Sequence, residues 1–316
     1  MDSVKKQTGN FFKNTAENGL EIRQGQVEMA DEVCTAFEKQ LPLAVEAEVG
    51  IGKSFAYLVP AVLKFAQDQK QIVIATSTIS LQEQLSKDAH NVLKMLGINI
   101  DIVVAKGMKN YICNRRLNGF VSCNKQDFVS QKLLNIVRNG NCDTAKIYMK
   151  IPKKVLEKIT IKNFGNENCM TCESRISCEY SAIRKQIADG KNIVICNQNM
   201  LVSHLVNSER GRGIFAENCS VYIIDEAHNL ENKFRDAFSV SYSRQNLIRC
   251  LNSYSEKASF DKSKLSKQLA GSMCETIQKL YAELNRQVHH QQKAIDDSAS
   301  SFFFTQTKEV IYSHLI

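Results

Sequence analysis

The sequence predicts an α/β fold in which helices cover both faces of a parallel sheet. Short runs rich in valine and isoleucine alternate with longer segments whose apolar residues recur at helical spacing. Runs of this kind are typical of strands that are buried on both faces, as the strands of parallel sheets are. One long segment interrupts the alternation, and it carries six of the 11 cysteines.

The expected strands follow one another along the chain with helices between them. Five apolar runs are expected to form strands, at residues 41–47, 72–75, 100–105, 193–196 and 221–224. Segments with helical spacing lie between them, at residues 53–66, 80–96 and 173–188. This alternation predicts a doubly wound core.

Residues 106–190 are expected to form an inserted subdomain, because a short connection would be enough at this point of the core. Beyond residue 230 the pattern becomes helical, and its apolar stripe is expected to pack against neighbouring helices rather than to form a functional surface. The stripe contains Leu265, Leu269, Met273, Ile277, Leu280 and Leu284.

The composition is that of an ordinary globular protein. Hydrophobic residues make up 43% and charged residues 23% of the 316 residues, which is enough for one large or two modest domains with packed cores. The N-terminus is polar where a signal peptide is apolar, and no run of about 18 apolar residues is present. We therefore expect a cytoplasmic protein that does not enter a membrane. In that reducing compartment the cysteines indicate metal or cluster ligation rather than disulfides.

The positive charge is concentrated in the expected insert. The net charge is +8, and residues 106–190 hold 16 lysines and arginines against 7 acidic residues, a balance of +9. The rest of the chain is close to neutral. A local cationic surface suits a polyanion such as a nucleic-acid backbone, although a solvated lysine-rich face explains the same charge.

The first motif is the string AEVGIGKS at residues 47–54, between an expected strand and an expected helix. Its glycines let the backbone turn N–H groups towards phosphate oxygens, and the positive end of the helix adds attraction. Lys53 would reach the β- and γ-phosphates, and the Ser54 hydroxyl would bind Mg²⁺. A glycine turn at the start of an ordinary helix is the alternative. The predicted nucleotide loop comprises Ala47, Glu48, Val49, Gly50, Ile51, Gly52, Lys53 and Ser54.

The second motif is the string IIDEAHNL at residues 223–230, at the C-terminal end of an expected strand. Open α/β sheets place their sites at this end. Asp225 can hold the Mg²⁺ that Ser54 also binds, and Glu226 can orient and deprotonate the attacking water. His228 is by itself an ordinary structural histidine, but within this string we expect it to link the nucleotide site to a nucleic-acid track.

These motifs and three further strings make the chain resemble superfamily 2 iron-sulfur DNA helicases of the DinG and XPD (Rad3-like) type, over about residues 20 to 235. The strings are EIRQGQVEMA at residues 21–30, ATSTISLQEQL at 75–85 and KGMKNYIC at 106–113. The resemblance implies that Arg23 and Gln26 recognise adenine. It also implies that Thr78 and Gln82, in the second string, contact DNA.

The same resemblance implies a [4Fe-4S] cluster in the insert. The string KGMKNYIC would supply the first ligand, Cys113, and a Cys-x-x-Cys-x-x-x-x-x-Cys run would supply the other three. The four ligands would be Cys113, Cys169, Cys172 and Cys178. Two alternatives stay open: a structural zinc held by the same thiolates, and replacement of Cys113 by Cys123 or Cys142.

By resemblance, the chain divides into the parts of a RecA-like motor. Residues 1–105 and 191–235 would form the first motor domain, and residues 106–190 the basic iron-sulfur insert. Residues 236–316 would be the truncated start of an Arch-like helical region. The DNA contacts expected in the insert are Arg115, Arg116, Lys153 and Lys154.

The chain also departs from the family pattern. Glu48 stands where glycine is usual beside the phosphates, which predicts weaker nucleotide binding, and Gln198 stands where histidine is common. No helicase motif follows DEAH. We therefore expect a fragment whose second motor domain, with its catalytic arginines, lies in the same or a following chain.

The predicted function is an ATP-dependent helicase that acts on single-stranded or branched DNA, with 5′-to-3′ polarity implied by the resemblance only. ATP, Mg²⁺ and the cluster are the expected cofactors. One alternative is a truncated ATP- and DNA-binding iron-sulfur module without efficient hydrolysis. The other is an unrelated P-loop ATPase with a zinc-binding insert.

Overall fold

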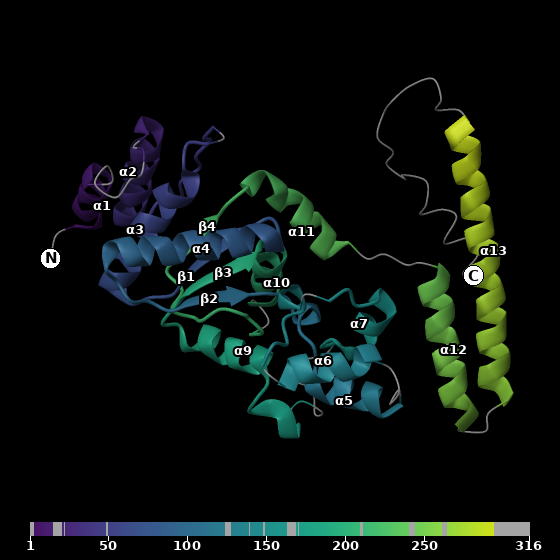
Figure 1. The fold of residues 1–316 in the computed structure, drawn as a ribbon. Coiled ribbons are helices and arrows are strands. Elements are labelled where there is room, and N and C mark those ends of the chain that lie inside the picture. Colours follow the sequence, from purple (N-terminus) through teal and green to yellow (C-terminus); the bar gives the residue numbers. More distant parts are fainter. Residues whose placement is uncertain are drawn as a thin grey trace. The chain divides into compact units, whose positions relative to one another are not determined.

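The computed structural model of the chain (Figure 1) describes residues 3–14, 21, 23–48, 50–123, 128–138, 140–147, 149–162, 169, 171–208, 211–239, 244–260 and 264–293. The chain divides into two compact units, Met1–Phe238 and Ser239–Ile316. Within the described ranges, no helix is both long enough and apolar enough to cross a membrane.

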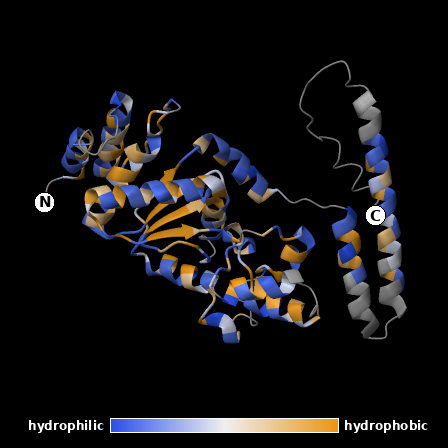
Figure 2. Ribbon diagram, in the orientation of Figure 1, coloured by the Kyte–Doolittle hydropathy of each residue, from blue (hydrophilic) through white to orange (hydrophobic). Residues whose placement is uncertain are grey.

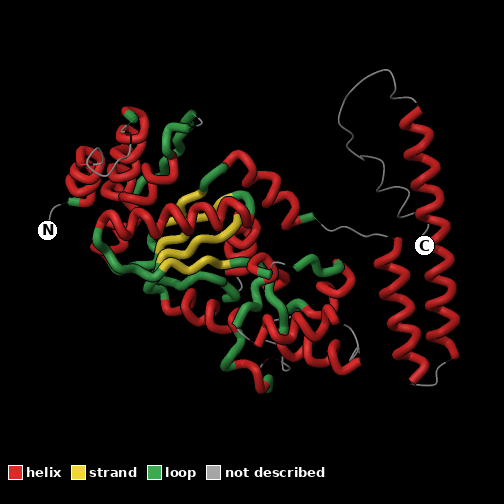
Figure 3. The backbone as a smooth tube through the Cα atoms, in the orientation of Figure 1, coloured by secondary structure: helices red, strands yellow, loops and turns green. Residues whose placement is uncertain are grey.

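A four-stranded sheet forms the centre of the first unit (Figure 3). Its order is β2-β3-β1-β4, and all neighbouring pairs are parallel. The strands are β1 (Ile72–Thr76), β2 (Ile102–Ala105), β3 (Ile193–Asn197) and β4 (Val221–Ile224). Ile72 lies opposite Ile193 on one side and Val221 on the other. The C-terminal ends of β1, β3 and β4 therefore meet at one edge of the sheet.

Alternate residues along the strands face two different helical layers. Ile72 and Ile74 pack into a core on one face, whereas Val73 and Ala75 pack into a second core on the other face. The first face is covered by α1 (Val4–Lys13), α2 (Gln24–Lys39), α3 (Lys53–Asp68) and α4 (Ile79–Leu96). The second face is covered by α9 (Glu179–Asp189) and α10 (Gln198–Ser208). Figure 2 shows hydrophobic strands between these helices, so the predicted α/β core with a parallel sheet is confirmed.

The helices that lead to the site begin and end at local signals. Gly52 precedes α3 with a φ of 87°, a left-handed conformation that glycine adopts without strain. The Thr78 hydroxyl caps α4 by accepting the Leu81 N–H at 3.2 Å. Gly97 ends α4 with a φ of 65°.

Residues 106–190 leave the sheet after β2 and build a small core of their own. Its helices are α5 (Asn114–Cys123), α6 (Phe128–Arg138) and α7 (Lys153–Ile159), with 3₁₀ turns η2 (Met108–Asn110), η3 (Thr144–Lys146) and η4 (Glu173–Arg175). The core contains Ile112, Leu117, Val121, Leu133, Val137, Cys142, Ile147 and Ile159. The last helix of this segment, α9, returns the chain to the sheet, because Ile187 packs into the second sheet core.

After β4 the first unit ends with η5 (Ala227–Asn229) and α11 (Leu230–Phe238). In the second unit, α12 (Arg244–Phe260) and α13 (Lys264–Lys293) pack against each other, so the expected helical region is confirmed. Ile277 is half-buried, but Leu269 and Met273 are 61% and 47% exposed. The expected packing of the stripe therefore does not extend to these two residues.

Four of the five expected strands are confirmed as β1 to β4, and the strand expected at residues 41–47 is wrong. These residues form no strand, and Leu41, Leu43 and Val45 are exposed. A strand needs a partner for its backbone hydrogen bonds. Residues 41–47 do not pair with β4, whose only neighbour among the described strands is β1. The helix expected at residues 173–188 is also too long, because α9 begins only at Glu179.

Candidate functional site

The phosphate loop turns sharply into α3. Gly50 and Gly52 have φ values of 88° and 87°, so both positions require the freedom of glycine. Lys53 is the first residue of α3, and its Nζ donates to the Ala47 carbonyl oxygen at 3.2 Å. Val49 lies outside the described residues. The strand expected before this loop is absent among the described residues. The glycines of the loop nevertheless have the backbone geometry that the motif predicts.

The start of α2 packs directly against this loop. Gln26 Nε2 donates to the Gly52 carbonyl oxygen at 3.0 Å, and an Arg23 guanidinium nitrogen would lie 3.7 Å from a Cβ at Gly50. A Cβ at Gly25 would lie 2.3 Å from Cδ1 of Ile51, so only glycine permits this close approach without a shift. The two residues predicted to recognise adenine therefore lie beside the predicted phosphate loop.

The two carboxylates of the DEAH string lie at the C-terminal end of β4. The Asp225 N–H donates to the Ala75 carbonyl oxygen at 2.8 Å, and the Asp225 carboxylate accepts from the Thr76 hydroxyl at 3.2 Å. Glu226 has a φ of 54°, which is strained for a residue with a side chain. The Gln198 amide supports this turn by donating to the Asp225 and Glu226 carbonyl oxygens at 2.8 and 2.9 Å.

Burial is the main influence on the Asp225 carboxyl. It raises the pKa of that group, and the neighbouring Glu226 charge raises it further. The Thr76 hydroxyl and the positive charge of Lys53 act in the opposite direction. The charge of Lys53, the predicted phosphate-binding lysine, therefore influences Asp225, the predicted Mg²⁺ ligand.

One cavity unites the two motifs. It has a volume of about 960 Å³ and is lined by Ala47 and Lys53 from the loop and by Asp225, Glu226 and His228 from the DEAH string. Its wall also includes β4 and the exposed residues Leu41, Leu43 and Val45. A cavity of this size is within the range of small-ligand sites, about 300–1,000 Å³.

His228 lies at the exposed rim of this site. Its Nδ1 is 3.4 Å from a Glu226 carboxylate oxygen, and its Nε2 is 2.9 Å from the Asn229 side-chain nitrogen. Its side chain is 70% exposed. The contact with Glu226 fits the predicted link away from the nucleotide site, which stays a prediction.

Sequence reasoning missed the roles of Gln198 and Tyr57. Gln198 was noted only as a departure from a family pattern, yet it fixes the turn that carries both carboxylates. Tyr57 on α3 lines the cavity, and burial, followed by the charge of Asp225, raises its pKa. A side-chain hydrogen bond with Ser54, the predicted Mg²⁺ ligand of the loop, acts in the opposite direction. A polar residue directly after strand β3 was the one available signal for Gln198.

The cysteines predicted to hold a cluster gather at the root of the insert. Cys113 and Cys178 pack against the same small core around Tyr111, and the Cys172 N–H donates to the Cys169 carbonyl oxygen at 3.4 Å. Burial raises the pKa of the Cys178 thiol, and the nearby Cys113 and Cys172 raise it further. Among the described residues, no three histidine, cysteine or acidic side chains are arranged to hold a metal ion.

Cys142, one of the two alternative ligands, lies close to this group. It is 4% exposed, and burial, followed by Glu179, Cys178 and Cys113, raises its pKa to about 12. Its backbone N–H donates to a Glu179 carboxylate oxygen at 2.9 Å. The other alternative, Cys123, is exposed at the end of α5.

The two predicted DNA contacts on α4 have different surroundings. Thr78 is exposed at the start of the helix. Gln82 is fully buried, and its Nε2 donates to the carbonyl oxygens of Ala105 and Ile195 at 3.0 and 3.3 Å. Direct contact of Gln82 with DNA stays a prediction, and this burial does not favour it.

The basic pairs of the insert lie on α5 and α7. Arg115 is exposed, whereas Arg116 is half-buried and its Nε donates to the Lys158 carbonyl oxygen at 2.8 Å. Lys153 and Lys154 are exposed in the first turn of α7. Both lysines are thus accessible to solvent.

Comparison with known proteins defines the class of this domain. Residues 25–126, which include the phosphate loop, match the family described as DEAD/DEAH box helicase. The cavity described above contains the DEAH carboxylates of that class. This part of the chain therefore matches a DEAD/DEAH box helicase domain.

Relatives narrow this class. The chain is 31% identical over 238 residues to the ATP-dependent DNA helicase YoaA of Escherichia coli, covering 73% of this chain and 36% of the relative. It is 26% identical over 264 residues to the ATP-dependent DNA helicase DinG of Photobacterium profundum, covering 77% and 36%. It is 27% identical over 220 residues to the 3′-5′ exonuclease DinG of Bacillus subtilis, covering 67% and 23%. The chain is a homologue of the DinG and YoaA helicases and spans about a third or less of their length.

Proposed function

We propose that this chain is the nucleotide-binding part of a DNA helicase motor, which couples ATP hydrolysis to movement along single-stranded DNA. The observation that carries the proposal is the single cavity lined by Lys53, Asp225 and Glu226. A phosphate-binding lysine beside two carboxylates is the set of residues that Mg²⁺-dependent phosphoryl transfer uses. The 5′-to-3′ direction rests on the resemblance to the DinG and XPD type. We propose branched DNA as an alternative substrate to single-stranded DNA.

Four roles in phosphoryl transfer have a residue of this chain in the proposal. Lys53 neutralises the β- and γ-phosphates, and Ser54 and Asp225 supply the oxygen ligands that Mg²⁺ prefers. Bound Mg²⁺ would offset the charge that develops on the phosphates. Glu226 orients the attacking water and takes its proton. Arg23 and Gln26, which lie against the loop, would hold the adenine.

The proposal requires an arginine from elsewhere. The described residues that line the cavity include Lys53, Lys64 and Lys70 but no arginine. An arginine finger accelerates phosphoryl transfer by about 10³- to 10⁵-fold in other nucleotide hydrolases. We propose that a second motor domain, in the same polypeptide or a following one, supplies it across this cavity.

DNA would bind along the basic insert and the start of α4. The charge balance of +9 in residues 106–190 supports this, as do Lys153 and Lys154 at the positive end of α7. Backbone contacts by such side chains give affinity without sequence preference. Arg115 and Thr78 are exposed and extend the same set of contacts.

The insert would be held together by a [4Fe-4S] cluster on Cys113, Cys169, Cys172 and Cys178. Four thiolates are the donor set such a cluster takes, and the mutual influence of Cys113, Cys172 and Cys178 supports their proximity. Cys142, whose pKa is raised in part by Cys178 and Cys113, is an alternative to Cys113 as a ligand. A bound cluster would cross-link segments far apart in the sequence, and a zinc ion on the same thiolates would do the same.

Glu48 and the absence of an arginine among the described cavity residues favour a second candidate function. In it, the chain binds ATP, DNA and a cluster but does not hydrolyse ATP efficiently. A carboxylate beside bound phosphates repels them, which lowers nucleotide affinity.

Binding and turnover of Mg-ATP test the proposal and separate the two candidates. We expect the 316-residue chain to bind Mg-ATP weakly and to hydrolyse it barely above background. A longer polypeptide with the second motor domain is expected to hydrolyse ATP in a DNA-stimulated way. Lys53→Ala and Glu226→Gln should abolish that turnover. Lys64→Ala is the matched control, because Lys64 lines the same cavity but pairs with Asp68 at 2.9 Å on its own helix.

The outcomes are distinct. Binding that survives Lys53→Ala would contradict the assignment of the nucleotide site. A longer polypeptide without DNA-stimulated turnover would favour the binding module. Robust DNA-stimulated turnover by the 316-residue chain alone would mean that a second copy or a partner supplies the arginine.

A further inference from the structure

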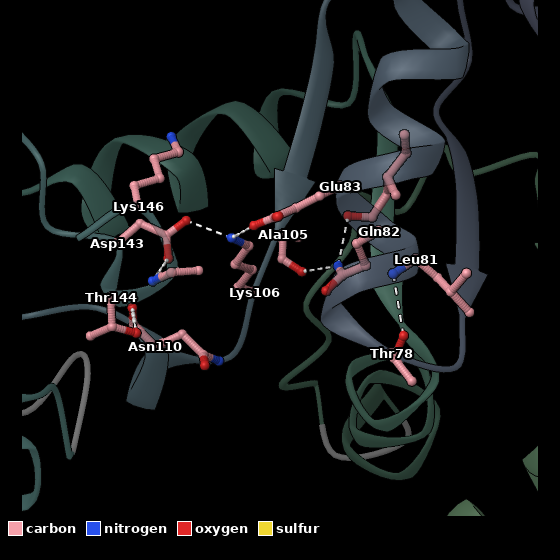
Figure 4. Close-up of polar contacts among 12 residues, drawn as sticks. Thr78, Leu81, Gln82, Glu83, Ala105, Lys106, Asn110, Asp143, Thr144 and Lys146 are labelled. Carbon is pink, nitrogen blue, oxygen red and sulfur yellow. Dashed lines mark hydrogen bonds and ion pairs between the residues drawn. The ribbon is translucent and has the colours of Figure 1, made fainter. Parts of the chain in front are cut away.

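Lys106 is a buried cation that joins three separate parts of the first unit (Figure 4). It follows β2 directly and is only 3% exposed. Its Nζ donates to an Asp143 carboxylate oxygen at 2.6 Å and to a Glu83 carboxylate oxygen at 2.9 Å. Glu83 belongs to α4, whereas Asp143 belongs to the insert.

The surroundings of Lys106 keep it charged and paired. Burial lowers the pKa of the ammonium, but the bonds to Asp143 and Glu83 outweigh this effect and raise the pKa. Asp143 is buried as well, and its second carboxylate oxygen accepts the Ala145 N–H at 3.0 Å. A buried ion pair of this kind costs desolvation, so it contributes defined geometry more than net stability.

On the insert side, Asp143 fixes the segment that carries the first predicted cluster ligand. It forms an antiparallel bridge with Tyr111, and its neighbours Cys142 and Thr144 bond to residues on either side of that bridge. The Ile112 N–H donates to the Cys142 carbonyl oxygen at 2.8 Å. The Thr144 hydroxyl donates to the Asn110 carbonyl oxygen at 3.0 Å. Residues 142–144 are therefore bonded to residues 110–112, directly before Cys113, and Asp143 within them contacts Lys106.

On the motor side, Glu83 lies on the helix that begins at Thr78. The adjacent Gln82 fixes this helix to the ends of two strands through its bonds to Ala105 and Ile195. Glu83 itself is 49% exposed and points to Lys106. The ammonium thus connects the helix with the predicted DNA contact to the base of the basic insert.

We infer that Lys106 is a positioning residue that holds the insert against α4, so that one DNA strand contacts both as a continuous surface. This inference rests on the proposed DNA-binding function. Two weak sites held at a fixed distance bind a long ligand much more tightly than either binds alone, because the second contact becomes intramolecular. That gain disappears when the sites no longer keep their relative orientation.

The dependence of affinity on the length of the DNA tests the inference. Fluorescence anisotropy measures the binding of labelled oligothymidylates to the full chain. A strand of about 6 nucleotides can contact either α4 or the insert, whereas one of about 20 nucleotides can contact both. For the unmodified protein we expect the longer strand to bind at least about tenfold more tightly. Lys106→Met keeps the side-chain length but removes the charge. We expect it to remove most of this gain and to leave the affinity for the short strand unchanged.

A second variant separates positioning from folding. Lys106→Met alone leaves Asp143 buried without its partner, and this variant is expected to unfold at a lower temperature. Asp143→Asn added to Lys106→Met removes both charges and keeps an oxygen for the Ala145 N–H. We expect the double variant to regain the unfolding temperature but not the length gain, because no bond to Glu83 is restored. Lys5→Met is the control, since Lys5 pairs with Asp31 at 2.9 Å between two other helices and is half-exposed.

A folded double variant with the full length gain would overturn the inference and make Lys106 a purely structural residue. An unmodified protein that binds short and long strands equally well would overturn it too, and would leave the proposed function intact. An unmodified protein that binds no single-stranded DNA would overturn both.

Discussion

The two outer strands of the sheet end in opposite kinds of surroundings. β2 runs directly into Lys106, whose charge is buried and bonded to two carboxylates. β4 presents an edge that has no second strand among the described residues, and its Tyr222 is 41% exposed. Beside that edge, Leu41 and Val45 are exposed along the cavity.

This difference separates a completed interface from an open one. On the β2 side, polar groups are buried because each finds its partner within residues 1–238. On the β4 side, the apolar residues Leu41 and Val45 are exposed along the cavity, and β4 has one neighbouring strand among the described residues, as β2 does. The contacts of Lys106 at the base of the proposed DNA surface therefore lie within residues 1–238, whereas the cavity of the proposed nucleotide site has exposed apolar residues along its wall.

The largest expected effect concerns the insert, which follows β2. If the cluster is present, protein purified without oxygen should be brown and absorb near about 400 nm, and Cys172→Ser should abolish this absorption. Residues 106–190 should then become sensitive to proteolysis, because a cross-link is lost. Colourless protein with one bound zinc would favour the zinc alternative. Cys250→Ser is the control, since Cys250 is exposed and lies outside the insert.

The next effect concerns DNA binding by the same side. Reversal of both lysines of α7, Lys153→Glu with Lys154→Glu, should weaken single-stranded DNA binding about tenfold or more at moderate salt and reduce its salt dependence. A fluorescence titration at several salt concentrations measures both. Arg116→Gln provides a comparison, because the Arg116 side chain bonds to the Lys158 carbonyl oxygen and its loss should lower stability as well. Unchanged binding after the lysine reversals would move the DNA surface to α4.

A smaller effect is expected on the open side. Glu48→Gly removes a carboxylate from the phosphate loop and should tighten Mg-ATP binding about fivefold, the size of a single charge repulsion in a partly solvated site. Calorimetric titration of the nucleotide measures this change. Glu46→Gly is the control, because Glu46 lines the cavity but lies outside the motif. Equal gains in both variants would mean that general charge, rather than the loop position, limits affinity.

The sequence predicted the parts that depend on local pattern. β1 and β4 begin at the predicted residues, because short runs of valine and isoleucine between turns specify buried strands. Both motifs also lie beside one cavity, as their positions at helix starts and strand ends implied. The failure at residues 41–47 has a different origin. Those residues have the composition of a strand, but strand formation depends on a partner that lies far away in the sequence or outside it.

The polar contacts that shape the sites were not predictable for a similar reason. Lys106 gave no sign that its partners would be 23 and 37 residues away. Gln198 bonds to carbonyl oxygens 27 and 28 residues away, and the pattern around it indicates only the end of a strand. Such contacts follow from the order of the strands in the sheet. A single sequence does not specify that order.

The smallest expected effect tests the comparison itself with two valines of similar sequence context. Val73 is 1% exposed in β1, whereas Val45 is 44% exposed in the run that was expected to be a strand. Val73→Ala should lower the free energy of unfolding by about 2 kcal/mol, through lost burial and a new cavity. Val45→Ala should change it by less than about 0.5 kcal/mol, as exposed substitutions do. Thermal or urea unfolding of the 316-residue chain measures both.

Equal losses would mean that residues 41–47 pack into the sheet in solution and that the β4 edge is closed. If the small effect of Val45→Ala becomes large in a longer polypeptide that contains the second motor domain, the additional sequence completes the wall of the nucleotide site.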